Sequence, residues 1–217
     1  MFGAWTDASG QKEKADACRE LARIGTRQAV PVLASLLADE NLSHMACYAL
    51  EPIADPAASA ALRAALGTLK GRWLAGVIRS LGVRKDREAV ELLARYLNDS
   101  DPVVAEAAAR ALGNIGGAAA LALENALASG SANRLAVCEG LFRCAEEMAG
   151  PEATVIYDKV RAIPNLPHHL RVAALRGAIQ SRGTLGLPLL CEAIRTESYV
   201  PAIDAIFERL GKNRADY

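Results

Sequence analysis

Apolar residues recur along this chain in a phrase that repeats. The phrase runs from residue 17 to 25, again from 46 to 54, and a third time from 108 to 116, with apolar positions three and four residues apart. That spacing is typical of one face of an amphipathic helix. Self-similarity at a short period indicates units that are too small to bury an apolar face alone and therefore stack on one another.

The period of the repeat predicts helical hairpins. Its equivalent points are spaced 29, 28, 34, 29, 37 and 29 residues apart along the chain. A unit of about 29 residues fits two helices of three turns each and two tight turns. Alanine supplies 44 of the 217 residues and aromatic residues only 5%, which favours helix over strand. The equivalent points are Leu21, Leu50, Ile78, Leu112, Leu141, Ala178 and Phe207.

The second helix of each unit has its own template, seen at residues 29–37 and 89–97. Pro31 and Pro188 fall inside such templates, so we expect them to bend or shift their helices.

Turn residues mark the ends of the predicted helices. Asp101 is expected to be an N-cap with Pro102 in the first helical position, and Asp55 and Gly150 precede prolines in the same way. Three glycines stand where a first helix should stop and are expected to take a positive φ: Gly25, Gly82 and Gly116.

These features resemble HEAT repeats of the short bacterial type, also called phycobilisome-lyase-like HEAT repeats. The Asp-Pro start, the Ala-Ala-x-Ala-Leu-x-x-Ile-Gly first helix and the Ala-Val-Pro-x-Leu-x-x-Leu-Leu second helix carry the resemblance, from about Lys12 to Gly211. It implies an all-α fold, a right-handed α-α superhelix (solenoid) of six to seven hairpins. We expect one domain over 1–217, with a lead at 1–11, repeats at 12–211 and a tail at 212–217.

The charge balance argues against nucleic acid as the partner. Lys and Arg together number 25, as do Asp and Glu, so the chain lacks the positive field that gathers phosphates. The chain carries no Gly-rich phosphate loop, nucleophile elbow or His-Glu-x-x-His helix. It also lacks the His-Glu pairs of the di-iron hydroxylase of the HEAT class. We therefore predict a protein that is not an enzyme and that has neither a cofactor nor a metal.

The cysteines and histidines do not form a recognisable site. Five cysteines without short pair spacing indicate reduced thiols, mostly in the core. Cys18 and Cys47 occupy the same place in successive repeats and are expected to be stacking neighbours. His44 and Cys47 share a helix face in this reading, but two ligands are too few for structural zinc.

The resemblance implies that second helices line the concave side, where two positions per repeat should face a groove. The strip begins with Ala34 and Ser35, becomes basic, and is acidic with one Tyr in its second half. Mixed charge suits a protein or peptide better than a polyanion. The alternative is that these residues are ordinary solvent-exposed helix positions. The candidate binding residues are Arg63, Arg95, Glu124, Asn125, Tyr157, Asp158 and Glu192.

The predicted function is a non-catalytic interaction scaffold that binds a protein or peptide through this concave groove. The alternative, suggested only by the repeat type, is a lyase-type or maturation subunit that holds a tetrapyrrole or another small cofactor. A deep pocket lined by Trp73, Tyr48 or Cys47 would favour that alternative.

The end of the chain carries an unpaired apolar stripe between Tyr199 and Leu210. An array without a polar cap exposes its core, so we expect the natural protein to continue, as a larger protein of which this is a fragment. The alternatives are that the stripe turns inward as a cap, or that the chain self-associates through this C-terminal helix. No membrane partner is expected, because no apolar stretch reaches the ~20 residues of a membrane span. The chain as given predicts a cytoplasmic protein; a periplasmic or secreted one would need an export signal ahead of it.

Overall fold

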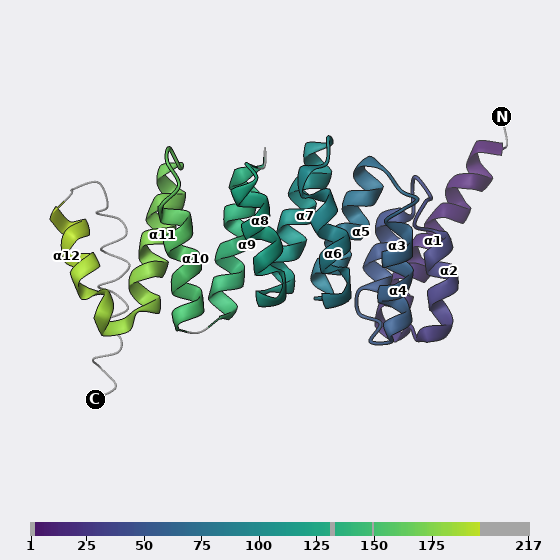
Figure 1. Cartoon of the computed structure of the whole chain (residues 1–217). Coiled ribbons are helices and arrows are strands. Elements are labelled where there is room, and N and C mark those ends of the chain that lie inside the picture. The colour runs from purple at the N-terminus through teal and green to yellow at the C-terminus, as the bar shows by residue number, and fades with distance from the viewer. Residues whose placement is uncertain (1–2, 131–132, 149, 196–217) are drawn as a thin grey trace. The chain divides into compact units, whose positions relative to one another are not determined.

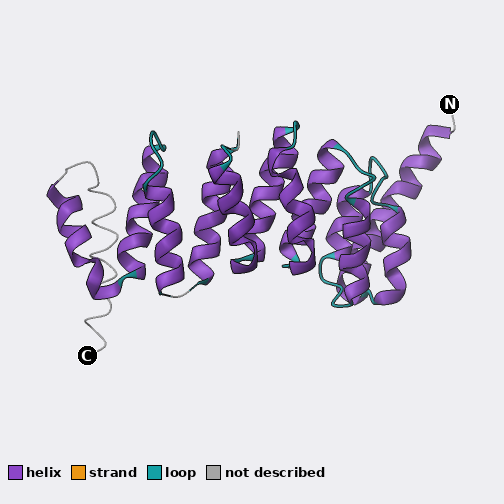
Figure 2. Ribbon diagram, viewed as in Figure 1, coloured by secondary structure: helices purple, strands orange, loops and turns teal. Residues whose placement is uncertain are grey.

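The computed structural model describes residues 3–130, 133–148 and 150–195, with no account of side chains before residue 10. These residues form α-helices, short 3₁₀ helices and connecting turns, and no strand occurs among them (Figure 2). The all-α prediction is confirmed. The stripe between Tyr199 and Leu210 lies outside the described residues.

The helices form six successive hairpins in the described part of the chain (Figure 1). The first helices are α1 (Gly3–Ile24), α3 (Ser43–Leu50), α5 (Gly71–Val83), α7 (Pro102–Ile115), α9 (Arg134–Glu147) and α11 (His168–Ser181). The second helices are α2 (Val30–Ser35), α4 (Pro56–Ala65), α6 (Val90–Ala94), α8 (Ala120–Ala128), α10 (Pro151–Arg161) and α12 (Leu187–Arg195). The 3₁₀ helices are η1 (Arg27–Ala29), η2 (Arg87–Ala89), η3 (Arg95–Asn98), η4 (Gly117–Ala119) and η5 (Gly183–Gly186).

Backbone contacts divide the chain into two compact units, unit 1 (Met1–Gly140) and unit 2 (Leu141–Tyr217). Helix α9 runs across the division. Helix α1 begins at Gly3 and so includes part of the expected lead at 1–11.

Helix starts follow the predicted capping chemistry. The Asp55 carboxylate accepts a hydrogen bond from the Ala57 N–H, and the Asp101 carboxylate accepts one from the Val103 N–H. Gly150 precedes Pro151 at the start of α10 with a φ of 64°. The Asp55 and Asp101 caps satisfy N–H groups that the first turn of a helix leaves without a partner.

The expected positive φ is present at Gly116, which ends α7 with a φ of 88°. It is absent at Gly25 and Gly82. Gly82 lies inside α5, and the chain reverses three residues later at Lys85, which has a φ of 50°. Gly82 is small for a packing reason, since a Cβ atom there would lie 2.6 Å from the Cα of Ala111.

Pro31 and Pro188, which are expected to bend or shift their helices, do not lie in helix interiors but in the first turns of α-helices. A 3₁₀ turn ends at Ala29, and α2 begins at Val30, so that Pro31 stands in its first turn. Pro188 is likewise the second residue of α12, after η5. An N–H is not needed at these positions, so proline starts the helices and does not distort them.

Stacking buries a continuous row of apolar side chains within each unit. In unit 1, α1 packs on α3, α3 on α5 and α5 on α7, while α2 packs on α4 and α6 on α8. Leu50, Ile78 and Leu112 are fully buried there. In unit 2, α10 packs on α11 and α11 on α12, and Leu141 and Ala178 are fully buried. Each hairpin thus buries its apolar face against a neighbour, as the repeat predicts.

Candidate functional site

In each second helix, the predicted groove residues lie one or two positions after a buried residue. That residue is Leu33, Leu62, Leu93, Leu123, Ile156 or Leu190. In unit 1 the residue two positions later is exposed in four consecutive repeats. We call this set the second-helix row of unit 1; its members are Ser35, Ala64, Arg95 and Asn125.

Arg95 and Asn125 therefore lie at the surface, while the concave groove that they are expected to line stays a prediction. Both side chains are exposed, and no hydrogen bond or ion pair of Arg95 occurs within the described residues. Glu124, the residue before Asn125, is half-buried. Glu192 is exposed on α12 in unit 2.

Arg63 joins two consecutive repeats. Its guanidinium pairs with the Asp86 carboxylate at 2.5 Å and with the Glu88 carboxylate at 2.8 Å, and its side chain is only 21% exposed. Asp86 is buried and also caps η2 by accepting from the Glu88 N–H. A side chain held between two repeats in this way is part of the packing, so Arg63 is a poor anchor for a partner.

A second arginine supports the same joint. Arg84, at the end of α5, donates to the carbonyl oxygens of Leu50 at 2.8 Å and Ile53 at 2.6 Å, and to the Ser59 Oγ at 2.8 Å. The last carbonyl groups of α3 have no partner inside their own helix, so Arg84 supplies it from the next repeat. Neither the spacing nor the composition of the sequence predicts this contact.

Tyr157 is not part of a binding surface. It is 8% exposed, and its ring stacks on Phe142 with ring centres 5.8 Å apart. The ring also occupies the space beside Gly177, where a Cβ atom would lie 2.2 Å from a ring carbon. Burial raises the pKa of the Tyr157 hydroxyl. The structure thus corrects the prediction, because the tyrosine side chain turns into the core of unit 2.

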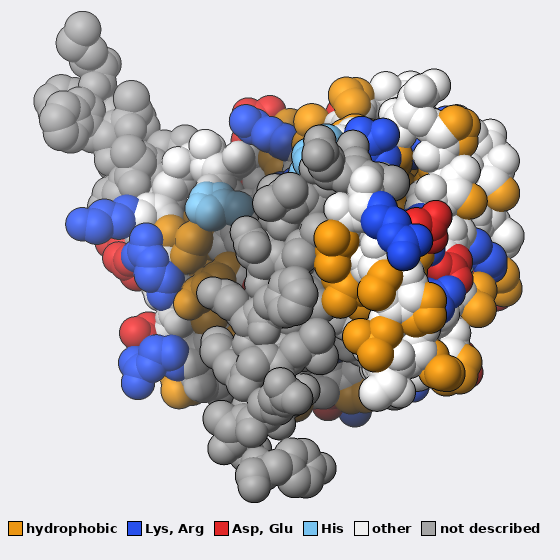
Figure 3. All heavy atoms as spheres, turned by 90° about the vertical axis from the view of Figure 1, so that its left-hand side faces the viewer, with side chains coloured by type: hydrophobic (Ala, Val, Ile, Leu, Met, Phe, Trp, Pro, Cys, Tyr) orange, Lys and Arg blue, Asp and Glu red, His pale blue; other side chains and the backbone are white. Residues whose placement is uncertain are grey.

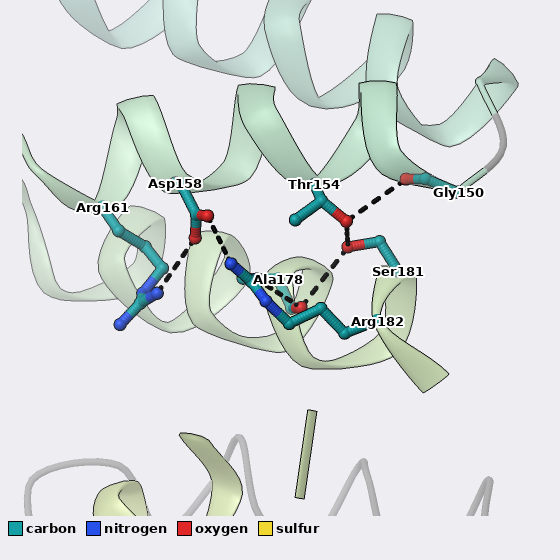
Figure 4. A network of polar contacts seen from close by, with 7 residues as sticks. All are labelled: Gly150, Thr154, Asp158, Arg161, Ala178, Ser181 and Arg182. Carbon is teal, nitrogen blue, oxygen red and sulfur yellow. Dashed lines mark hydrogen bonds and ion pairs between the residues drawn. The ribbon is translucent and has the colours of Figure 1, made fainter. Parts of the chain in front are cut away.

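Asp158 lies in a polar network within unit 2 (Figure 4). Its carboxylate pairs with Arg182 of the following repeat and with Arg161 at 3.1 Å. Beside it, the Thr154 hydroxyl donates to the Ser181 Oγ at 2.8 Å, and Arg182 also donates to the Ala178 carbonyl at 2.8 Å. As with Arg63, this predicted groove residue connects repeats.

Sequence reasoning missed the exposed aliphatic side chains of the second helices. In unit 1, Val32 is 60% exposed and Leu121 is 67% exposed. In unit 2, Leu185 in η5 is 81% exposed and Leu187, the first residue of α12, is 50% exposed. Figure 3, which views the side of the chain that carries α12, shows hydrophobic side chains gathered at the surface. The regular apolar pattern of the second helices does not distinguish these exposed side chains from the leucines of the core.

The thiols are buried, with one exception. Cys18, Cys47, Cys138 and Cys144 are buried and unbridged, whereas Cys191 is exposed. Burial raises the pKa of the Cys47 thiol to about 11, although a hydrogen bond with Ser80 opposes the effect. The exposed His44 does not share a surface with the buried Cys47. No group of three or more metal-ligating side chains occurs in the part of the chain that the structure describes.

The residues proposed for a cofactor pocket occupy different environments. Tyr48 is 54% exposed, whereas the neighbouring Cys47 is 5% exposed. Trp73 is half-buried, and the Arg72 guanidinium lies over its ring at 4.9 Å from the ring centre. The described residues also include no helix long and apolar enough to cross a membrane.

Comparison with known proteins agrees with the hairpin geometry. The sequence model of HEAT repeats matches residues 5–74 and again residues 72–141, which together exceed half of the chain. The chain belongs to the HEAT repeat family. The resemblance inferred from the residues is thereby confirmed, while the right-handed superhelix stays a prediction. No curated protein matches this HEAT repeat chain.

Two solved structures are similar to these HEAT repeats. One is the complex of CpcE and CpcF of phycocyanin lyase from Nostoc sp. PCC7120, with 25% identity over 75% of this chain and 69% of that chain, at a TM-score of 0.49. The other is human deoxyhypusine hydroxylase in complex with glycerol, with 18% identity over 91% of this chain and 97% of that chain, at a TM-score of 0.39.

Proposed function

We propose that this HEAT repeat protein is a non-catalytic scaffold that binds a protein or peptide segment through the second-helix row of unit 1. The observation that carries the proposal is the repetition of one exposed position in four consecutive repeats, at Ser35, Ala64, Arg95 and Asn125. An extended partner that runs across the helices would meet an equivalent position in each repeat.

The chemistry of this surface supports a protein partner. Arg95 offers a guanidinium that no acidic side chain of the described residues occupies, and Leu121 offers an apolar side chain two positions before Leu123. Arginine is a frequent anchor at protein interfaces, and the exposed leucine adds apolar area that a partner can bury. Ser35 and Ala64 are small, which leaves a partner backbone room to approach.

The contacts between repeats decide which residues a test should change. Arg63→Glu would place a third carboxylate beside Asp86 and Glu88 and would destabilise the joint, so a loss of binding would carry no information. Arg95→Glu and Leu121→Glu alter exposed side chains only.

The experiment is affinity capture from the lysate of the source cell with the wild-type chain and with the Arg95→Glu/Leu121→Glu variant. We expect the variant to lose the retained protein while its helical circular dichroism is unchanged. Lys12→Glu, an exposed charge reversal on α1, serves as the control and should retain the partner. Equal capture by wild type and the double variant would exclude the second-helix row as the binding surface.

A further inference from the structure

The exposed face of α3 and α5 combines aromatic and cationic side chains without acidic ones. Neither helix contains an Asp or a Glu. On α3, His44 and Tyr48 are exposed and four residues apart. On α5, Arg72 and Arg79 are exposed on either side of the half-buried Gly76. These five residues form what we call the α3–α5 patch.

Two contacts between α3 and α5 indicate that the patch residues of the two helices lie at similar levels along the helix axes. The Cys47 Sγ lies 3.9 Å from the position of a Cβ atom on Gly76. One turn further along, the Ser80 hydroxyl donates to the Glu51 Oε1 at 2.7 Å. Tyr48, next to Cys47, therefore lies at about the level of Gly76 along the two helices, where α5 has no side chain. Arg72 and Arg79 are each about one helical turn away from that glycine along α5.

The two arginines are not neutralised by neighbouring helices. No ion pair of Arg72 or Arg79 occurs within the described residues. Burial has the largest effect on the pKa of the Cys47 thiol and raises it, while the positive charge of Arg79 acts in the opposite direction and lowers it. Arg72 lies over the Trp73 ring, which restricts its guanidinium. A cation that is already held in place loses less entropy when it binds an anion.

Several acidic groups on the elements around the patch have other partners. Glu51 is half-buried and accepts from Ser80, and Asp101 caps α7. On α1, which packs on α3, Asp16 pairs with Arg19 and Glu20 pairs with Arg23. On α7, which packs on α5, Glu106 pairs with Arg110 at 2.7 Å.

We infer that the α3–α5 patch is a second binding surface, which takes a short acidic peptide segment. One carboxylate would pair with Arg72 and another with Arg79, while the peptide backbone passes over Gly76 and packs against the Tyr48 ring. Because the chain as a whole has no net charge, and α1 and α7 carry carboxylates of their own, the patch fits a segment with a few acidic residues better than a long polyanion. This surface lies on first helices and does not depend on the second-helix row.

The test measures binding of a fluorescein-labelled, Glu-rich peptide to the full chain by fluorescence anisotropy, with the Gln counterpart of the peptide as the uncharged control. We expect the Glu peptide to bind and the Gln peptide to bind at least about tenfold more weakly, with an affinity for the Glu peptide that falls as salt is added. Arg72→Glu/Arg79→Glu should weaken binding of the Glu peptide by more than about tenfold, since it replaces attraction by repulsion at both positions.

Gly76→Gln tests the open position over α5. A Cβ atom at Gly76 makes ordinary contact with Cys47, and the longer glutamine side chain would extend from there toward the path of the peptide, with circular dichroism as the check that the variant folds. We expect about tenfold weaker binding. Gly10→Gln on α1, where a Cβ atom would meet nothing within 4 Å, is the matched control and should bind as wild type does.

Three results would overturn the inference. The first is equal binding of the Glu and Gln peptides, and the second is unchanged binding by both α5 variants with intact circular dichroism. The third is tighter binding of a single-stranded oligonucleotide than of the Glu peptide, lost on Arg72→Glu/Arg79→Glu, which would assign the patch to nucleic acid. Arg95→Glu should leave the Glu peptide bound, so failure of the second-helix row and failure of this patch are distinguishable.

Discussion

Neighbouring first helices of unit 1 meet backbone to backbone, whereas in unit 2 a tyrosine ring fills the space beside a glycine. A Cβ atom on Gly113 would lie 2.7 Å from the Cα of Gly140, and one on Gly82 would lie 2.6 Å from the Cα of Ala111. In unit 2 the neighbour of Gly177 is the Tyr157 ring. Glycine therefore serves close helix contact in one unit and accommodates a large side chain in the other.

The polar joints differ in the same way. In unit 1 the second helix supplies the cation, Arg63, and the next repeat supplies the buried Asp86. In unit 2 the second helix supplies the anion, Asp158, and the next repeat supplies Arg182. One hairpin architecture is thus held together by opposite charge arrangements, so a joint residue from one unit is not a substitute for its counterpart in the other.

Removing the tyrosine ring should have the largest effect on stability. Tyr157→Ala deletes a buried ring and leaves a cavity beside Phe142 and Gly177, so we expect the free energy of unfolding to fall by about 4 kcal/mol in urea titration. Tyr157→Phe keeps the ring and should cost less than about 1 kcal/mol. If Tyr157→Ala were as mild as Tyr157→Phe, the ring would not hold unit 2 together.

Adding one methyl group should separate the two kinds of glycine. Gly113→Ala places a Cβ atom against the backbone of Gly140, which cannot yield as a side chain can, and we expect a loss of roughly 2 to 3 kcal/mol. Gly76→Ala, in the same kind of helix but with its Cβ 3.9 Å from the Cys47 Sγ, should be neutral or stabilising by up to about 1 kcal/mol. Equal effects of the two changes in a denaturant titration would contradict the close contact at Gly113.

Breaking the Arg63–Asp86 and Asp158–Arg182 ion pairs should cost different amounts of stability, because the Asp86 carboxylate is more deeply buried than that of Asp158. Arg63→Ala leaves the Asp86 carboxylate, whose side chain is 6% exposed, without its cation, and we expect a loss of about 2 kcal/mol. Asp158→Asn acts where the carboxylate is 39% exposed and should cost less than about 1 kcal/mol, because water screens the pair. Thermal unfolding of both variants at one pH makes the comparison, and a larger loss for Asp158→Asn would reverse it.

Alkaline pH should weaken the folded state through its buried thiols. Burial raises the pKa of the Cys47 and Cys138 thiols to about 11, so the folded protein keeps these protons above the pH at which an unfolded cysteine releases them. Stability present below pH 9 is therefore lost as the pH rises toward 11, by about 1.4 kcal/mol per thiol and pH unit. Urea titrations across this range test the slope, which Cys47→Ala should reduce.

Labelling of the cysteine thiols tests the smallest of the expected effects. At neutral pH we expect a thiol reagent to modify the exposed Cys191 in the folded protein and to reach the four buried thiols only after unfolding. Rapid modification of Cys144 in the folded protein would show that the core of unit 2 opens readily.

The sequence by itself determined the helical hairpins, their order and many of their ends. Apolar spacing and alanine content fix amphipathic helices, and the side chains of Asp55 and Asp101 cap the helices that follow them, because these are interactions between residues near in sequence. Membership of the HEAT repeats follows from the same local phrases. The four exposed positions of the second-helix row were also predictable, since helix periodicity alone turns them away from the buried leucines.

Only the tertiary structure decided what the polar and aromatic residues do. Arg63, Tyr157 and Asp158 fall, like Arg95, one or two positions after the buried residue of a second helix, yet the first three join repeats or fill the core while Arg95 faces solvent. The difference depends on Asp86, Gly177 and Arg182, which lie twenty or more residues away in the sequence and become neighbours only when the repeats stack. Helix periodicity predicts the direction in which a side chain points. Which residue that side chain contacts depends on the shape and charge of the next repeat.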